Sequence, residues 1–67
     1  MTKQEAIEQM EKGVKITHPY FQPDEWMTMK KGKIFLEDGV KCYPREFWVY
    51  RTEGDWNDGY SVFTESN

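Results

Sequence analysis

The 67-residue sequence has little of what usually stabilises a small protein. It holds one cysteine, Cys42, and one histidine, His18. A single cysteine excludes an internal disulfide, and one thiol with one imidazole gives no cluster of soft metal ligands. At this length a chain forms one domain that buries only about 60% of its unfolded surface. We therefore expect a single domain, residues 1–67, held together by aromatic packing and self-association into a homo-oligomer, with no cofactor.

Signals for catalysis are also missing. Nucleophilic catalysis needs a Ser, Cys or Thr beside a base that a third group orients, and His18 is the only imidazole in the chain. The sequence has no glycine-rich phosphate motif and no metal-ligand spacing. Its paired acids, Glu37 with Asp38 and Asp55 with Asp58, stand in turn-like segments, where acidic residues are common. These absences predict a binding protein, not an enzyme.

Positive charge is scarce, since the net charge is −3 and the sequence pI is about 5.0. Recognition of a nucleic acid polymer needs clustered Lys and Arg, so no such partner is expected. Lys30, Lys31 and Lys33 form a short basic loop, which is either a solvated turn or a contact for one or two phosphates of a small ligand.

Long apolar segments are absent as well. No apolar run approaches the roughly 20 residues of a membrane span, and the N-terminus lacks the layout of a signal peptide. A free cysteine in such a chain suits a reducing compartment. We expect a cytoplasmic protein without a membrane partner.

The N-terminal segment carries the clearest helix signal. Thr2 and Glu5 have the spacing of a capping box, which predicts that a helix begins at Lys3. Ala6, Ile7 and Met10 recur at helical spacing and form one apolar face. Gly13 can adopt the left-handed conformation that ends a helix. The helix should therefore pack this face on the rest of the domain.

The remaining segments predict a small antiparallel sheet and a second helix. Alternating apolar residues and turn signals indicate extended segments at residues 14–18, 25–29, 33–37, 40–43 and 60–63, with a hairpin turn at 30–32. Pro44 suits the first turn of a helix, although Phe47–Tyr50 also suits a strand. We predict an α+β fold: an N-terminal helix on an antiparallel sheet of three to four strands, with a short second helix before the last strand.

Aromatic residues are abundant, and they concentrate between residues 43 and 63. Trp48, Trp56 and Tyr60 are interrupted there by acidic residues and an asparagine. Rings stack on nucleobases, and Asp and Asn bind base edges and ribose hydroxyls, which favours a small nucleotide as ligand. The same rings also suit a small core. The candidate ligand-binding residues are His18, Tyr20, Phe21, Trp26, Trp48, Asp55, Trp56, Asp58 and Tyr60.

Four segments resemble a known family. They are Glu5-Ala6-Ile7, Gly13-Val14-Lys15-Ile16, Phe47-Trp48 and the block from Asp55 to Phe63. Together they look like a shortened version of the phage Thoeris anti-defence proteins of the second type. The resemblance implies a phage protein that sequesters cyclic ADP-ribose-type immune signals at subunit interfaces without degrading them. It also implies stacking by Tyr20 and Phe21 and polar contacts from the block between Asp55 and Tyr60.

A second function stays open. Acidic residues occur along the chain and could form a surface that mimics nucleic acid against a basic groove. The protein would then be a small inhibitor that binds and blocks a host defence protein, as anti-CRISPR proteins do. The residues concerned are Glu5, Glu8, Glu11, Asp24, Glu25, Glu37 and Asp38.

Overall fold

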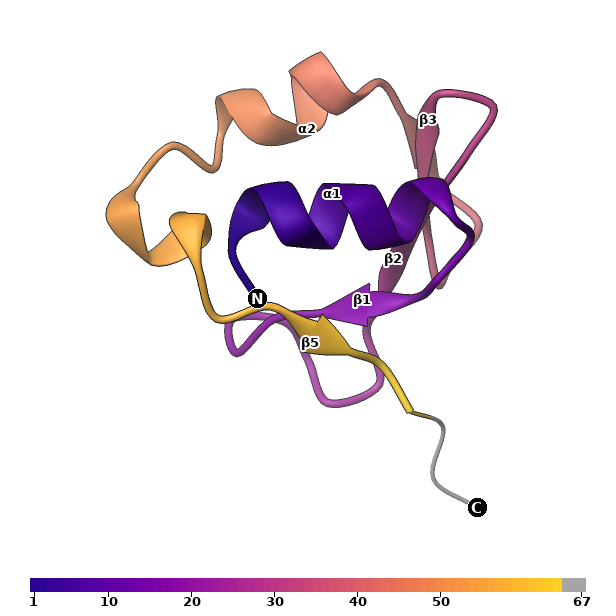
Figure 1. The fold of residues 1–67 in the computed structure, drawn as a ribbon. Helices are drawn as coiled ribbons and strands as arrows, with labels where there is room; N and C mark the ends of the chain where they lie inside the picture. The colour runs from indigo at the N-terminus through magenta and orange to yellow at the C-terminus, as the bar shows by residue number, and fades with distance from the viewer. Residues whose placement is uncertain (65–67) are drawn as a thin grey trace.

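The computed structural model describes residues 1–64, in which two α-helices pack on one face of a five-stranded antiparallel sheet (Figure 1). The strands lie in the order β4-β3-β2-β1-β5. This confirms the predicted α+β fold with a short helix before the last strand. The sheet has five strands where three to four were predicted; β4 and β5 have two residues each and fall within the extended segments expected at residues 40–43 and 60–63. The elements are α1 Lys3–Glu11, β1 Ile16–Thr17, β2 Met27–Lys30, β3 Lys33–Leu36, β4 Lys41–Cys42, α2 Pro44–Val49, the 3₁₀ helix η1 Gly54–Asn57 and β5 Ser61–Val62.

Helix α1 begins with the predicted capping box. The amide of Glu5 donates to Thr2 Oγ1 at 3.2 Å, and the amide of Thr2 donates to Glu5 Oε1 at 2.9 Å. The bond from the Thr2 amide favours the ionised carboxylate and lowers the pKa of Glu5, with the Thr2 hydroxyl as a second cause. At the other end Gly13 has φ +89°, the left-handed conformation that ends a helix. Local sequence therefore sets both ends of α1.

The β2–β3 hairpin turns through two residues with positive φ. Lys31 has φ +53° and Gly32 has φ +78°, as in the primed two-residue turns that match the twist of a hairpin. The register pairs Lys30 with Lys33, Met29 with Ile34 and Thr28 with Phe35. Because side chains alternate between faces, Phe35, Lys30 and Lys33 all lie on the face opposite to Ile34.

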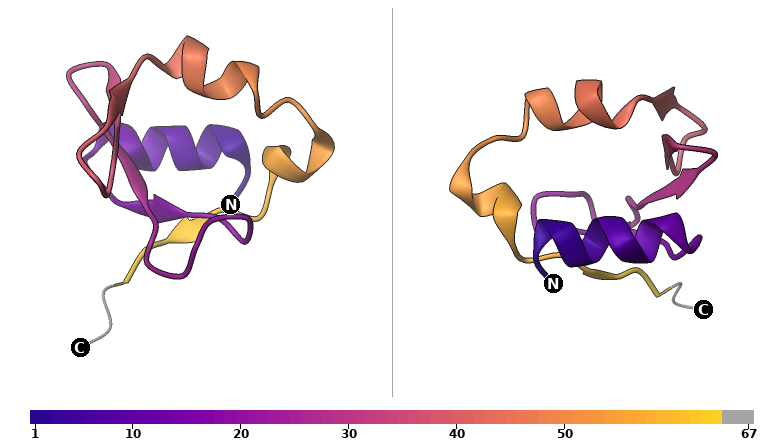
Figure 2. Two further views of the ribbon diagram at one scale, coloured as in Figure 1. Left: turned by 180° about the vertical axis from the view of Figure 1, so that it is seen from behind. Right: turned by 45° about the horizontal axis from the view of Figure 1, so that its top comes forward.

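The core lies between the sheet and the two helices (Figure 2). Ile16, Met27 and Ile34 from the sheet are fully buried together with Ala6 and Met10 of α1. The cluster is completed by Phe47 and Tyr60. Both helices contribute to this single cluster, so within residues 1–64 no helix covers the other face of the sheet.

Helix α2 begins at Pro44, as its sequence predicts, and places Phe47 in the core. The Arg51 guanidinium lies 3.9 Å from the centre of the Phe47 ring and donates to the carbonyl of Phe47 at 3.0 Å. After η1 the chain returns to the N-terminus. There the amide of Tyr60 donates to the carbonyl of Met1 at 3.1 Å, and the Met1 ammonium donates to the carbonyl of Tyr60 at 2.6 Å. Segments from the two ends of the chain are thereby joined.

Candidate functional site

His18 links two loops that are distant in sequence. Its side chain is 4% exposed, and its Nε2 lies 3.0 Å from the carbonyl oxygen of Asp55 and 2.9 Å from that of Asp58. The amide of Tyr20 donates to Nδ1 at 3.2 Å. Carbonyls only accept and amides only donate, so these partners require the proton on Nε2 and a free lone pair on Nδ1. Both ring nitrogens are satisfied, and the imidazole fastens residues 18–20 to residues 55–58.

Aromatic rings surround this imidazole. Trp56 stacks on His18 with ring centres 4.3 Å apart and an angle of 23°, while Tyr60 packs at 4.7 Å and Tyr20 at 5.3 Å, edge-on. The Tyr60 hydroxyl donates to the carbonyl of Trp56 at 2.6 Å. Burial raises the pKa of Tyr60 to about 12. One face of the Trp56 ring is therefore covered by the His18 imidazole.

A cleft of about 300 Å³ opens beside this cluster, and we call it the loop cleft. Tyr20 is 57% exposed, and its hydroxyl donates to the carboxylate of Asp55, which raises the pKa of Tyr20. Gly59 has φ +92°, a backbone conformation that residues other than glycine rarely adopt. The cleft is lined by His18, Pro19, Tyr20, Gly54, Asp55, Asp58 and Gly59.

The structure brings most of the predicted site residues together. His18, Tyr20, Asp55 and Asp58 line the loop cleft, and the rings of Phe21, Trp56 and Tyr60 pack on His18 behind it. Sequence reasoning missed Pro19, Gly54 and Gly59, which contribute backbone and ring surface without a polar side chain.

Of the other two predicted residues, Trp48 reaches this group of rings only through Tyr60, and Trp26 lies apart from it. Trp48 contacts Tyr60 edge-on at 6.1 Å, and the Nζ atom of Lys3 lies 4.4 Å from the centre of its ring. Trp26 instead packs near Phe63 at 6.4 Å, with Lys15 Nζ 4.4 Å from its ring. These contacts separate Trp26 from the rings around His18.

The loop cleft offers acceptors and no cation. The carboxylates of Asp55 and Asp58 are exposed, and no Lys or Arg lines the cleft. Two positive groups lie near it: the Met1 ammonium is 3.8 Å from Asp58 Oδ1, and the Arg51 guanidinium is 5.4 Å from the centre of the Trp56 ring. This arrangement suits hydroxyl and amino groups of a ligand better than its phosphates.

A second cleft, of about 350 Å³, lies at the β2–β3 hairpin, and we call it the hairpin cleft. It is lined by Lys30, Lys31, Lys33, Lys41 and Phe35. Three of these lysines form the basic loop of the sequence. Lys41 and Phe35 were missed, although they are cross-strand partners in β3 and β4, because no signal in the sequence fixes that register.

Three other features carry no site. Burial raises the pKa of the Cys42 thiol, which disfavours a reactive thiolate. Within residues 1–64 no three His, Cys, Asp or Glu side chains are grouped so that they could hold a metal ion. No helix in the same range is long and apolar enough to cross a membrane.

Comparisons of the chain with protein-family models, with curated proteins and with solved structures found no match.

Proposed function

We propose that this is a phage-encoded anti-defence protein that binds and sequesters a small nucleotide immune signal without chemically changing it. The signal would be of the cyclic ADP-ribose type or a cyclic dinucleotide, in the cytoplasm of an infected bacterial cell. The observation that carries the proposal is the loop cleft. Its walls come from residues 18–20 and 54–59, and it gathers polar and aromatic residues that the sequence singled out for nucleotide binding.

The groups in the cleft suit the ribose and base parts of such a ligand. The carboxylates of Asp55 and Asp58 can accept hydrogen bonds from ribose hydroxyls or from an exocyclic amine. The half-exposed ring of Tyr20 offers a surface on which a planar base can stack. His18 holds the two walls together through its bonds to the carbonyls of Asp55 and Asp58. The site is thereby preorganised, which lowers the entropic cost of binding.

Self-association would complete the site. A volume of about 300 Å³ is at the low end of the range for ligand pockets, about 300 to 1,000 Å³. The cleft also lacks a cation for the phosphates, which a second copy could supply. Val49 is 58% exposed and Tyr50 86% exposed at the end of α2, and such exposed apolar side chains favour contact between copies. We propose a homo-oligomer with the signal bound between subunits.

The test is isothermal titration of the protein with cyclic ADP-ribose and with a cyclic dinucleotide, with native mass spectrometry for the oligomeric state. We expect saturable binding, recovery of the intact nucleotide, and roughly tenfold weaker binding by Asp55→Ala, about 1.4 kcal/mol. Glu53→Ala is the matched control, because Glu53 is also acidic and exposed but does not line the cleft. No binding of either nucleotide and no nucleotide retained after purification would contradict the proposal.

The same preparation tests the alternative of a blocking inhibitor. Capture of a host defence protein that is lost when acidic residues of α1 are replaced, with no nucleotide bound, would favour that alternative. Glu5, Glu8 and Glu11 of α1 are exposed and are the residues to replace. Asp55→Ala should leave such a capture unchanged.

A further inference from the structure

We propose that the hairpin cleft is a second binding site, which takes the linear phosphate chain of a nucleoside di- or triphosphate with the base against Phe35. Four of its five lining residues are lysines, and the fifth is this half-buried aromatic ring. Ammonium groups attract phosphate oxygens, and an aromatic ring offers a stacking surface for a planar base. The proposal does not rest on the function proposed for the loop cleft.

The positive charge of the hairpin cleft is not neutralised by the protein. Within residues 1–64 no carboxylate lies within ion-pair distance of Lys30, Lys31, Lys33 or Lys41, the residues that surround the hollow. Glu11 lines a neighbouring cleft with Lys30 and Lys31 and forms no ion pair with them. The whole chain has a net charge of −3, so a cleft lined by four lysines differs strongly in charge from the rest of the protein.

The register of the sheet concentrates this charge. Lys30 lies directly opposite Lys33, and like charges at opposed positions destabilise a sheet. Lys41 lies opposite Phe35, with its Nζ 5.6 Å from the centre of the ring. A chain of phosphates between these ammonium groups would relieve the repulsion, and its several negative charges match a site with several lysines better than a single phosphate does.

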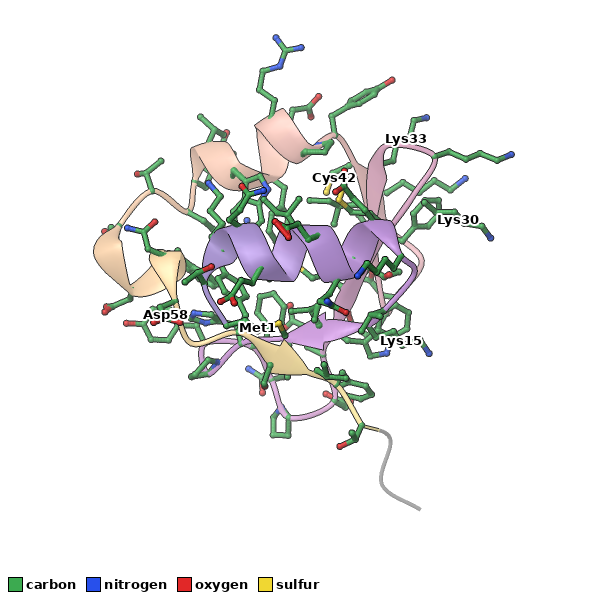
Figure 3. All side chains as sticks on the ribbon, viewed as in Figure 1. Met1, Lys15, Lys30, Lys33, Cys42 and Asp58 are labelled. Carbon is green, nitrogen blue, oxygen red and sulfur yellow. The ribbon has the colours of Figure 1, made fainter. Side chains whose placement is uncertain are left out.

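The two clefts lie on different parts of the molecule. Figure 3 shows Lys30 and Lys33 on one side, and Asp58 and Met1 toward the other. No residue lines both clefts. Substitutions in the hairpin cleft can therefore be tested without altering the loop cleft.

The experiment is titration of the full chain with ATP, ADP, AMP, tripolyphosphate and adenosine at low salt. We expect affinity to rise from AMP to ADP to ATP, and adenosine to show no binding. Raising the salt from about 50 to about 200 mM should weaken ATP binding several-fold, because ion contacts are screened. The double variant Lys30→Gln/Lys33→Gln should bind ATP at least tenfold more weakly. Lys12→Gln, which removes one exposed charge outside the cleft, should bind ATP as the unmodified chain does.

The ring is tested separately. Phe35→Leu should weaken ATP binding several-fold and leave tripolyphosphate binding unchanged, while Phe35→Tyr, which keeps a stacking ring and is the check on folding, should bind both normally.

Equal affinity for ATP and tripolyphosphate would overturn the role of the base. Equal affinity of ATP for the double lysine variant and the unmodified chain would overturn the site. Tighter, length-dependent binding of single-stranded oligonucleotides would overturn it in favour of a polymer. Cyclic ADP-ribose binding should survive every one of these substitutions, so failure here is distinct from failure at the loop cleft.

Discussion

The loop cleft and the hairpin cleft differ in how their polar groups are used. In the loop cleft His18 bonds to the carbonyls of Asp55 and Asp58, and the Tyr20 hydroxyl bonds to the carboxylate of Asp55. In the hairpin cleft four lysines converge without an ion pair to a described residue. The first cleft is built by contacts that also stabilise the fold. The second is built by a local turn and holds charges that repel one another.

In the loop cleft, stability and binding depend on the same contacts. Around His18 a substitution removes fold contacts and site contacts together, so a loss of binding there needs a stability control. At the hairpin the lysines are exposed, and their removal should change binding far more than stability. Natural proteins often retain destabilising groups where a ligand needs them.

The largest expected effect is a loss of stability when His18 is replaced. His18→Ala leaves the carbonyls of Asp55 and Asp58 without their donor and removes the stack with Trp56. We expect the free energy of unfolding to fall by about 3 kcal/mol, combining a lost buried ring with unsatisfied acceptors. Urea unfolding followed by tryptophan fluorescence measures it. Lys33→Ala is the control and should change stability by less than about 0.5 kcal/mol. Equal effects of the two substitutions would remove the contrast between the clefts.

A smaller effect is expected at Tyr60. Tyr60→Phe removes the bond from the hydroxyl to the carbonyl of Trp56, at a cost of about 1 kcal/mol at neutral pH. The hydroxyl also predicts a pH dependence. Its pKa is about 12 in the folded protein and about 10 in an unfolded chain, so the folded state retains the proton longer. Stability from this group is complete below about pH 10 and is lost as the pH rises toward 12.

Urea unfolding of both proteins between pH 8 and roughly pH 11 isolates the contribution of Tyr60, because the two proteins differ only in this hydroxyl. The difference in stability between the unmodified chain and Tyr60→Phe should shrink as the pH rises above about 10. A difference that stays constant with pH would show that burial does not protect this hydroxyl.

The smallest expected effect is a gain in stability when Lys33 is replaced. Lys33→Glu replaces the repulsion between Lys30 and Lys33 with an attractive cross-strand pair, so stability should rise by about 0.5 kcal/mol. The same substitution should abolish ATP binding at the hairpin cleft. Lys33→Gln, which removes the repulsion without adding attraction, should give a smaller gain. A loss of stability in Lys33→Glu would mean that these lysines do not repel each other in the folded protein.

Much of the fold was predictable because its signals are local. The capping box of Thr2 and Glu5, the Lys31-Gly32 turn and Pro44 at the start of α2 each act through neighbouring residues, and the structure has all three. The edge strands β4 and β5 fall within segments that were expected to be extended, but the sequence did not show which strands they pair with. Their pairing depends on contacts with β3 and β1.

The candidate site was predictable in its residue types and not in its geometry. Sequence reasoning named His18, Tyr20 and the segment from Asp55 to Tyr60, and the structure gathers them. It also grouped Trp26 with them, and the sheet places that ring beside Phe63 instead. Trp26 and Phe63 are far apart in the sequence, so no local pattern shows that their rings meet.

The amino-acid sequence by itself determined the helix ends, the hairpin turn and the scarcity of histidine and cysteine, because these depend on residue type and short spacing. Only the tertiary structure decided that a buried histidine joins two loops 37 residues or more apart, and that four lysines and one aromatic ring line the same cleft. The reason is physical: hydrogen bonds and charge clusters between distant segments exist only after the sheet has fixed which strands are neighbours.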